Sequence, residues 1–374
     1  MMILIFFIIA CFAAHPKHQI KAASTIDDVL KYFDEAVEGS NMCRAMSVFG
    51  EYTYTFQLKT GVTKYLFEDI SIKENIAPLG NYNRPGDVYA KYYVCVHDTG
   101  DVSVSAARWS EVVYNQGGDG WTYEASFQYV IDNDDIYHNI PDNECAYHAG
   151  DNIRPYQEIN TGITGTNEDP AITIIDGYFA IDGVNTWIAA PTDGTYITTD
   201  LINDCGIRVV LRDGTYYIGK TWFSSGYELV VNYGGNTNSI GIESCLMDGS
   251  DVYYTWQRLA KLVAKLLDEN NLCVADVQPH HFFDGKHCPM TMREASMWHH
   301  FLNLVEAEYT LLQYKQQGFS FSFKSGNTEY VSNSGRVIKA PSAATDVSYT
   351  ITVTKDGQSK SKTYKTTIQP QTSV

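Results

Sequence analysis

AKYYVCVHDTG, residues 90–100, is an apolar run rich in β-branched and aromatic residues that closes on a glycine. Such a run predicts a strand that is buried on both faces and opens into a turn. His97 stands where this predicted strand ends. Because that edge of an α/β sheet commonly carries binding and catalytic groups, His97 is the first candidate for a functional residue.

The segments on either side of this strand predict the rest of an α/β core. NSIGIESCL, residues 238–246, has the pattern of a second buried strand. Residues 253–270 repeat apolar side chains at helical spacing, and residues 291–312 predict a second helix with Thr291 as its N-cap. Strands followed by covering helices predict a mixed central sheet flanked by helices. A short helix over 26–40 and a hairpin over 127–141 complete the core prediction.

Two other regions are rich in strand and turn signals. Residues 152–236 form a string of short predicted strands, which indicates an inserted β-rich subdomain without a convincing internal repeat. Residues 316–374 end in a predicted hairpin around KDGQS and indicate a small C-terminal all-β, sandwich-like domain. In its pattern of strand and turn residues, this last segment resembles the immunoglobulin-like repeats of bacterial cell-surface proteins. Residues 24–70 are predicted to be a separate N-terminal lead segment.

The charge balance excludes nucleic acid as a partner. The formal net charge is -17, whereas nucleic-acid affinity depends on lysine and arginine neutralising phosphates. The charge is unevenly distributed, because residues 315–374 contain eight Lys+Arg and only three Asp+Glu. This asymmetry predicts that the C-terminal module has a task of its own.

The N-terminus predicts export. MMILIFFIIACFAA, residues 1–14, is too short to span a bilayer as a mature helix and has the pattern of a signal-peptide core, so residues 1–23 are assigned to a signal. IIAC ending at Cys11 also has the pattern of a lipoprotein processing site, which would leave Cys11 lipidated and the protein anchored in a membrane. A secreted or cell-surface location follows in either case, and an uncleaved anchor is the alternative. The eight cysteines are scattered and predict no particular disulfide.

HHFFDGKHCP, residues 280–289, concentrates groups that bind metals or perform catalysis. A catalytic zinc ion takes three protein ligands, often two from one local segment and one from a distant strand. His280 and Cys288 lie on either side of a glycine-containing loop that allows them to converge, and His97 fits the distant role. Lys286 is two residues before the cysteine and, in an extended segment, points to the same side. A Cys–His nucleophile and an ordinary polar loop are the alternatives.

Three motifs in order, VHDTG, SIGIES and HHFFDGKHCP, resemble the zinc-dependent N-acetylmuramoyl-L-alanine amidases of the amidase-2 type, whose superfamily includes the peptidoglycan recognition proteins. NYNRPG at 81–86, FQYVIDNDDIYHNIP at 127–141 and AYHAGD at 146–151 support the resemblance. It covers roughly residues 71–151 and 236–311. A catalytic domain over residues 71–312, interrupted by the 152–236 insertion, is therefore expected.

The resemblance implies a role for each matching residue. Zn²⁺ would be bound by His97, His280 and Cys288, with Glu243 and Lys286 as catalytic residues. The position of a participating tyrosine in relatives is Phe127 here, so that role is absent or falls to Tyr129. His148 would line the substrate cleft.

The implied activity is hydrolysis of the amide bond between N-acetylmuramic acid and L-alanine in peptidoglycan. The alternative is a non-catalytic peptidoglycan-binding protein of the same fold, and a Cys–His peptidase is a more distant one. The insertion would shape the rim of the cleft or cover it. The basic C-terminal module would hold the protein near anionic wall polymers or serve as a spacer.

Overall fold

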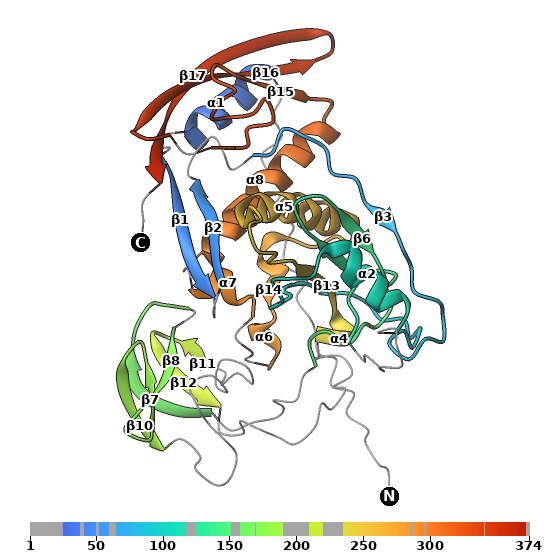
Figure 1. Cartoon of the computed structure of the whole chain (residues 1–374), viewed down its shortest axis with the longest axis vertical. Helices are drawn as coiled ribbons and strands as arrows, with labels where there is room; N and C mark the ends of the chain where they lie inside the picture. The colour runs from blue at the N-terminus through green and yellow to red at the C-terminus, as the bar shows by residue number, and fades with distance from the viewer. Residues whose placement is uncertain are drawn as a thin grey trace, which may run out of the picture.

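The computed structural model describes most of the chain between residues 25 and 371 (Figure 1). Predictions for residues 1–23, including Cys11, lie outside the described part. None of the helices in the described part is long and apolar enough to cross a membrane. The described residues are 25–37, 41–49, 52–59, 65–116, 125–150, 158–168, 170–189, 209–219, 235–284, 286, 288–294, 297–339 and 341–371.

A six-stranded mixed sheet forms the centre of the molecule, in the order β14-β4-β13-β5-β6-β3. The strands β14, β4, β13 and β5 are parallel, and β6 is antiparallel to β5. The predicted α/β core with a mixed sheet is therefore confirmed. The strand bounds are β3 (Lys73–Glu74), β4 (Tyr93–Asp98), β5 (Tyr129–Ile131), β6 (Ile136–His138), β13 (Ser239–Ser244) and β14 (Val277–Pro279).

Two long helices, α5 (Val252–Glu269) and α8 (Trp298–Gln316), pack together against one face of this sheet (Figure 1). The predicted apolar stripe of α5 is fully buried there, where it contacts Val94 and Val96 of β4. Burying such a stripe, at about 25 cal/mol per Å² of apolar surface, is the main force that attaches the helix to the sheet. The stripe consists of Leu259, Leu262, Val263 and Leu266.

The prediction of one helix over residues 291–312 is wrong. The structure has a short helix α7 (Met290–Glu294), followed by α8 from Trp298. The start of α7 is fixed to β4, because the Asp98 carboxylate accepts hydrogen bonds from the backbone N–H and the hydroxyl of Thr291 at 2.8 and 2.9 Å. A tertiary contact of this kind overrides helical periodicity, which senses only local spacing.

The opposite face of the sheet is only partly covered by helix. Helix α2 (Ala106–Tyr114) packs over β5 and β6. The shorter helices α4 (Gly235–Asn238) and α6 (His281–Asp284) contact β13 and β14. Between them, this face holds His97 and Cys95 of β4.

The insertion forms two three-stranded antiparallel sheets, as predicted for a β-rich subdomain. Their orders are β10-β9-β8 and β11-β12-β7, and they share one small apolar core. The bounds are β7 (Glu158–Thr164), β8 (Ile172–Ile175), β9 (Tyr178–Ile181), β10 (Val184–Ala189), β11 (Val209–Arg212) and β12 (Thr215–Gly219).

An early and a late segment of the chain form one five-stranded sheet, in the order β15-β16-β17-β1-β2 (Figure 1). Strand β1 pairs with β17 in parallel and so covers the edge of β17 that would otherwise be exposed. Helix α1 (Ile26–Val37) packs on β16 and β17 and shares their core through Val29 and Phe33. The bounds are β1 (Asn41–Phe49), β2 (Tyr52–Lys59), β15 (Ser320–Ser325), β16 (Thr345–Lys355) and β17 (Gln358–Gln371).

This shared sheet changes the predicted domain organisation. Residues 24–70 and 316–374 contribute strands to the same sheet, so in the described residues the lead segment is not structurally separate from the C-terminal module. The C-terminal segment is β-rich as predicted, and in the described residues its apolar face is covered by α1 rather than by a second sheet. Its likeness to immunoglobulin-like repeats stays a prediction.

Candidate metal centre

Three parallel strands bring the candidate site residues to one edge of the central sheet. His97 lies at the end of β4, and Glu243 of β13 is its register partner on the neighbouring strand. On the other side of β4, His280 directly follows β14, and its backbone N–H donates to the carbonyl of Val96 at 3.2 Å. Parallel strands end at the same edge, which explains how residues 183 positions apart become neighbours.

His97, His280 and Cys288 form a buried cluster whose ligand atoms all lie within 4.8 Å of one another. Each side chain is at most 5% exposed. The His97 Nδ1 atom and the Cys288 Sγ atom are 3.8 Å apart. Ligands of a tetrahedral zinc ion lie about 3.5 Å from one another, so this spacing fits a metal ion between the two atoms.

The protonation states of the cluster also suit a metal. Burial and the neighbouring His280 and His148 lower the pKa of His97 well below its usual value, so the ring is neutral, as a ligand must be. Burial and the Asp98 and Glu243 carboxylates raise the pKa of the Cys288 thiol well above its usual value. A thiol in such a place loses its proton only where a strong local cation stabilises the thiolate. A bound metal ion would be such a cation, and a nucleophilic cysteine without a metal would lack it.

The second nitrogen of His97 faces a different pair of side chains. His97 Nε2 lies 2.9 Å from His148 Nδ1 and 3.1 Å from Cys95 Sγ. These are hydrogen-bond distances, shorter than the separation of two ligands around one metal ion. We assign the His97 proton to Nε2, where it is donated to His148, and this leaves Nδ1 free to bind a metal.

The position of His148 depends on a glycine. The nearest strand residue, Gly241 of β13, has no side chain, and an added Cβ there would lie 2.6 Å from the His148 ring. The backbone on either side of the ring is also fixed, because Asn236 Oδ1 accepts the N–H groups of His148 and Ala149 at 2.8 and 2.7 Å. Sequence analysis placed His148 in the cleft, and the structure places it in contact with the metal cluster.

Glu243 faces the same cluster. Its Oε1 lies 3.8 Å from His97 Nδ1, whereas Oε2 is buried and accepts no hydrogen bond within the described residues. Burial raises the pKa of Glu243 to about 8, while the positive charge of Lys286 opposes that rise. A carboxylate with such a pKa is suited to accept and return a proton near neutral pH.

Lys286, two residues before Cys288, has a backbone carbonyl that accepts two hydrogen bonds. The Lys286 carbonyl accepts hydrogen bonds from the N–H of Cys288 at 2.7 Å and from Arg293 at 3.3 Å. Lys286 itself is exposed, close enough for its charge to act on His97 and Glu243. The structure thus brings together the five residues predicted as metal ligands or catalytic groups.

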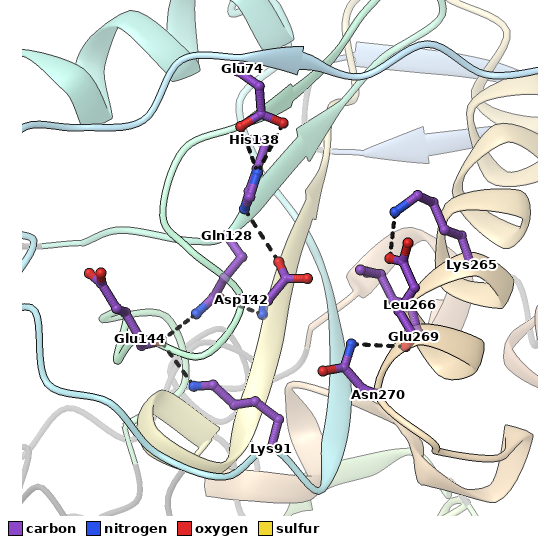
Figure 2. Close-up of polar contacts among 11 residues, drawn as sticks. Glu74, Lys91, Gln128, His138, Asp142, Glu144, Lys265, Leu266, Glu269 and Asn270 are labelled. Atoms are coloured by element: carbon purple, nitrogen blue, oxygen red, sulfur yellow. Dashed lines mark hydrogen bonds and ion pairs between the residues drawn. The ribbon is translucent and has the colours of Figure 1, made fainter.

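Tyr129 is the predicted site residue that the structure places elsewhere. It is the register partner of Ile242, so its side chain points to the face covered by α5, opposite to Glu243. Its ring is 3% exposed and stacks on His138 with a centroid distance of 4.5 Å. His138 lies between the Glu74 and Asp142 carboxylates at 3.0 and 3.3 Å (Figure 2). Tyr129 therefore does not meet the cluster.

Comparison with known proteins identifies the family. Residues 89–291, more than half of the chain, match the family model described as N-acetylmuramoyl-L-alanine amidase, of the amidase-2 type. The chain belongs to this family, and the matched residues include all five clustered side chains.

Two curated relatives from Bacillus subtilis (strain 168) are similar to the chain. The N-acetylmuramoyl-L-alanine amidase CwlH is 25% identical over 243 residues, which is 64% of this chain and 63% of that protein. The N-acetylmuramoyl-L-alanine amidase XlyA is 22% identical over 220 residues, 59% of this chain and 46% of that protein. The matches thus span less than two thirds of either relative. The solved catalytic domain of XlyA superposes with a TM-score of 0.38 at 21% identity, covering 63% of this chain and 99% of that structure.

Proposed function

We propose that the protein is a zinc-dependent amidase that hydrolyses the bond between N-acetylmuramic acid and L-alanine in peptidoglycan. The observation that carries this proposal is the buried His97–His280–Cys288 cluster, with Glu243 opposite His97 on the next strand. Family membership and the names of the relatives support the substrate class.

In the proposed site, His97 Nδ1, His280 and Cys288 Sγ hold the zinc ion. When bound, zinc supplies Lewis acidity that polarises the scissile carbonyl and makes water more acidic. The two histidines and the cysteine would supply three protein ligands, the number usual in catalytic zinc sites.

Glu243 carries the proton in this proposal. Its Oε2, which has no hydrogen-bond partner among the described residues, accepts the proton of the attacking water and returns it to the departing α-amine of L-alanine. Lys286 donates to the oxygen of the tetrahedral intermediate, where its positive charge stabilises the developing negative charge. His148 acts as a positioning residue that orients His97, rather than as a substrate contact.

Two alternatives are less well supported. A non-catalytic binding protein would not need a buried glutamate beside a complete ligand set. A Cys–His peptidase requires an accessible thiolate, whereas Cys288 is 4% exposed and has a raised thiol pKa.

The proposed surroundings are extracellular. Action on peptidoglycan requires export, in agreement with the predicted signal at residues 1–23 and the alternative of a lipid anchor at Cys11. Retention by anionic wall polymers is proposed for the basic C-terminal module. Five of its seven basic residues already form ion pairs, so this retention would be weak and sensitive to salt.

The test is the appearance of free L-alanine amino groups in purified peptidoglycan, measured with and without a chelator. The proposal expects release by the untreated protein, loss with the chelator and recovery after zinc is restored. Cleavage that persists in the chelator, or none after zinc is restored, would refute it.

A further inference from the structure

The two sheets of the insertion contain the same local backbone irregularity. In β10, Asn185 Oδ1 accepts the N–H of Trp187 at 2.7 Å, and Thr186 Oγ1 accepts the N–H of Ile188 at 3.1 Å. The Thr186 hydroxyl in turn donates to the carbonyl of Phe179 on the neighbouring strand β9 at 2.6 Å. The strand pairing shifts register here, so the irregularity is a β-bulge.

Strand β7 repeats each of these contacts. Asn160 Oδ1 accepts the N–H of Gly162 at 2.8 Å, and Thr161 Oγ1 accepts the N–H of Ile163 at 3.1 Å. The Thr161 hydroxyl donates to the carbonyl of Tyr216 on β12 at 2.8 Å, again beside a shift in register. The two halves of the subdomain are therefore structural counterparts, a correspondence that sequence analysis did not detect.

Within the shared Asn-Thr-x-Ile stretch, residues 160–163 and 185–188, the counterparts differ at one position. Both bulges require a left-handed backbone, with φ of 72° at Gly162 and 59° at Trp187. Glycine adopts this conformation without strain, whereas a large aromatic residue does so at a cost. Since β7 forms the same bulge with glycine, folding does not require a side chain at this position.

Packing does not account for Trp187 either. Its side chain is 75% exposed, the largest exposed fraction among the large apolar side chains of the described residues. It lies against Tyr178 at a centroid distance of 5.5 Å and an interplanar angle of 65°, and exposed Ile175 is the register partner of Tyr178 on β8. A strained and exposed tryptophan with an aromatic neighbour has the properties of a binding residue.

The insertion is attached to the core close to the His97–His280–Cys288 cluster. The chain leaves the core just after His148, which contacts His97, and returns at Gly235–Asn238. The two ends are joined by the hydrogen bond from Asn236 N–H to the Ala149 carbonyl, at 3.1 Å. The insertion is therefore attached beside the cluster at which the proposed scissile bond would lie.

We propose that Trp187 and Tyr178 form a platform for the pyranose rings of a glycan strand, which deepens and rests on the proposed peptidoglycan activity. A pyranose ring has an apolar C–H face and a polar rim, so it stacks on an aromatic face while its hydroxyl groups stay hydrated. The patch of two rings and the Ile175 side chain matches one or two sugars. It is far smaller than the ~800 Å² per partner of a stable protein interface.

The test uses the full-length holoprotein and the β-1,4-linked hexamer of N-acetylglucosamine, a glycan that lacks the scissile amide and so cannot be turned over. The variant is Trp187→Gly, which installs the residue of the counterpart bulge. Its control is Tyr114→Ala, which removes an exposed aromatic ring from α2. Affinity for the hexamer is measured by calorimetric titration.

We expect Trp187→Gly to weaken hexamer binding at least tenfold, with a Tm equal to or above that of the unmodified protein, whereas Tyr114→Ala changes neither. Cleavage of insoluble walls should fall, while cleavage of a soluble muramoyl peptide should not change. If the Tm falls instead, Trp187→Asn, which also tolerates the left-handed conformation, must reproduce the loss at an unchanged Tm.

Three outcomes would overturn the platform. These are unchanged hexamer affinity in Trp187→Gly, equal losses in Tyr114→Ala, and a dimer in sedimentation that Trp187→Gly dissociates, because a second copy would then occupy the patch. A protein that binds the hexamer but never releases L-alanine termini would contradict the proposed amidase activity alone.

Discussion

At His97 one imidazole has two separate tasks. Nδ1 faces Cys288 and Glu243, where a metal would be bound, and Nε2 faces His148 and Cys95. A ligand histidine that donates its other N–H is held in one tautomer and one orientation. The residues around Nε2 should therefore affect metal affinity without touching the metal.

His148 provides the test of that idea. Replacing it with leucine removes the acceptor of the His97 proton and should weaken zinc binding by about 10–100-fold, as is common for such outer partners. His148→Asn retains an oxygen near the Nδ1 position and should recover part of the affinity. Zinc affinity is measured by competition with a chromophoric chelator. Wild-type affinity in His148→Leu would show that the contact has no such role.

Sequence analysis found the residues of the candidate site, but not the partners that position them. His97, His280, Cys288, Glu243 and Lys286 followed from their motifs and the resemblance to amidases. The contacts of Cys95 and Asp98 depend on which strands pair and in what register. Neither the pairing nor the register can be predicted reliably from a single sequence. The same limit misplaced Tyr129, because a shift of one residue along a strand moves a side chain to the opposite face.

At the scale of elements, Lys91 ties the start of β4 to two other segments. Its Nζ donates to the carbonyl oxygens of Glu144 and Thr237, both at 3.0 Å (Figure 2 shows the contact with Glu144). Burial lowers the pKa of Lys91 to about 8, against about 10.4 for a lysine in the unfolded chain. Between these values the folded state binds fewer protons than the unfolded state.

The free energy of unfolding should therefore rise with pH through this window. The gain attributable to Lys91 is at most about 3 kcal/mol and is complete only above pH ~10.4. Urea unfolding at pH 7.5, 9 and 10 measures it, with Lys91→Met as the reference that lacks the titrating group. The rise of wild type relative to Lys91→Met is the expected result, and parallel pH profiles would contradict it.

The helices show what periodicity predicts well and what it does not. The apolar stripe of α5 was found from its spacing, because that stripe is buried against a sheet. The separate start of α7 was missed, since it is fixed by the contact between Asp98 and Thr291 across the fold.

At the scale of the whole molecule, an early and a late segment of the chain share one sheet. Residues 41–49 pair in parallel with β17, more than 300 positions later. Sequence analysis assigned residues 24–70 and 316–374 to separate domains, because parallel pairing at long range leaves no local signal. The tie should make the stability of the C-terminal sheet depend on α1.

Phe33 of α1 tests this dependence, since it is fully buried among residues of the C-terminal sheet. Phe33→Ala should destabilise that sheet by about 3–5 kcal/mol through loss of burial and the remaining cavity. Hydrogen exchange should speed up in β16 and β17 while β4 and β13 stay protected. Lys31→Ala, an exposed substitution on the same helix, is the control. Unchanged hydrogen exchange in β16 of Phe33→Ala would show that the stability of the C-terminal sheet does not depend on α1.

The central claim is that one cluster binds zinc and that Glu243 works beside the metal. The most direct measurement combines bound zinc, by mass spectrometry, with release of L-alanine termini, for wild type, Cys288→Ala and Glu243→Ala. Wild type should carry one zinc ion and be active, Cys288→Ala should lose both properties, and Glu243→Ala should keep zinc while activity falls by at least about 100-fold. Turnover retained by Glu243→Ala, or zinc and activity retained by Cys288→Ala, would contradict the account.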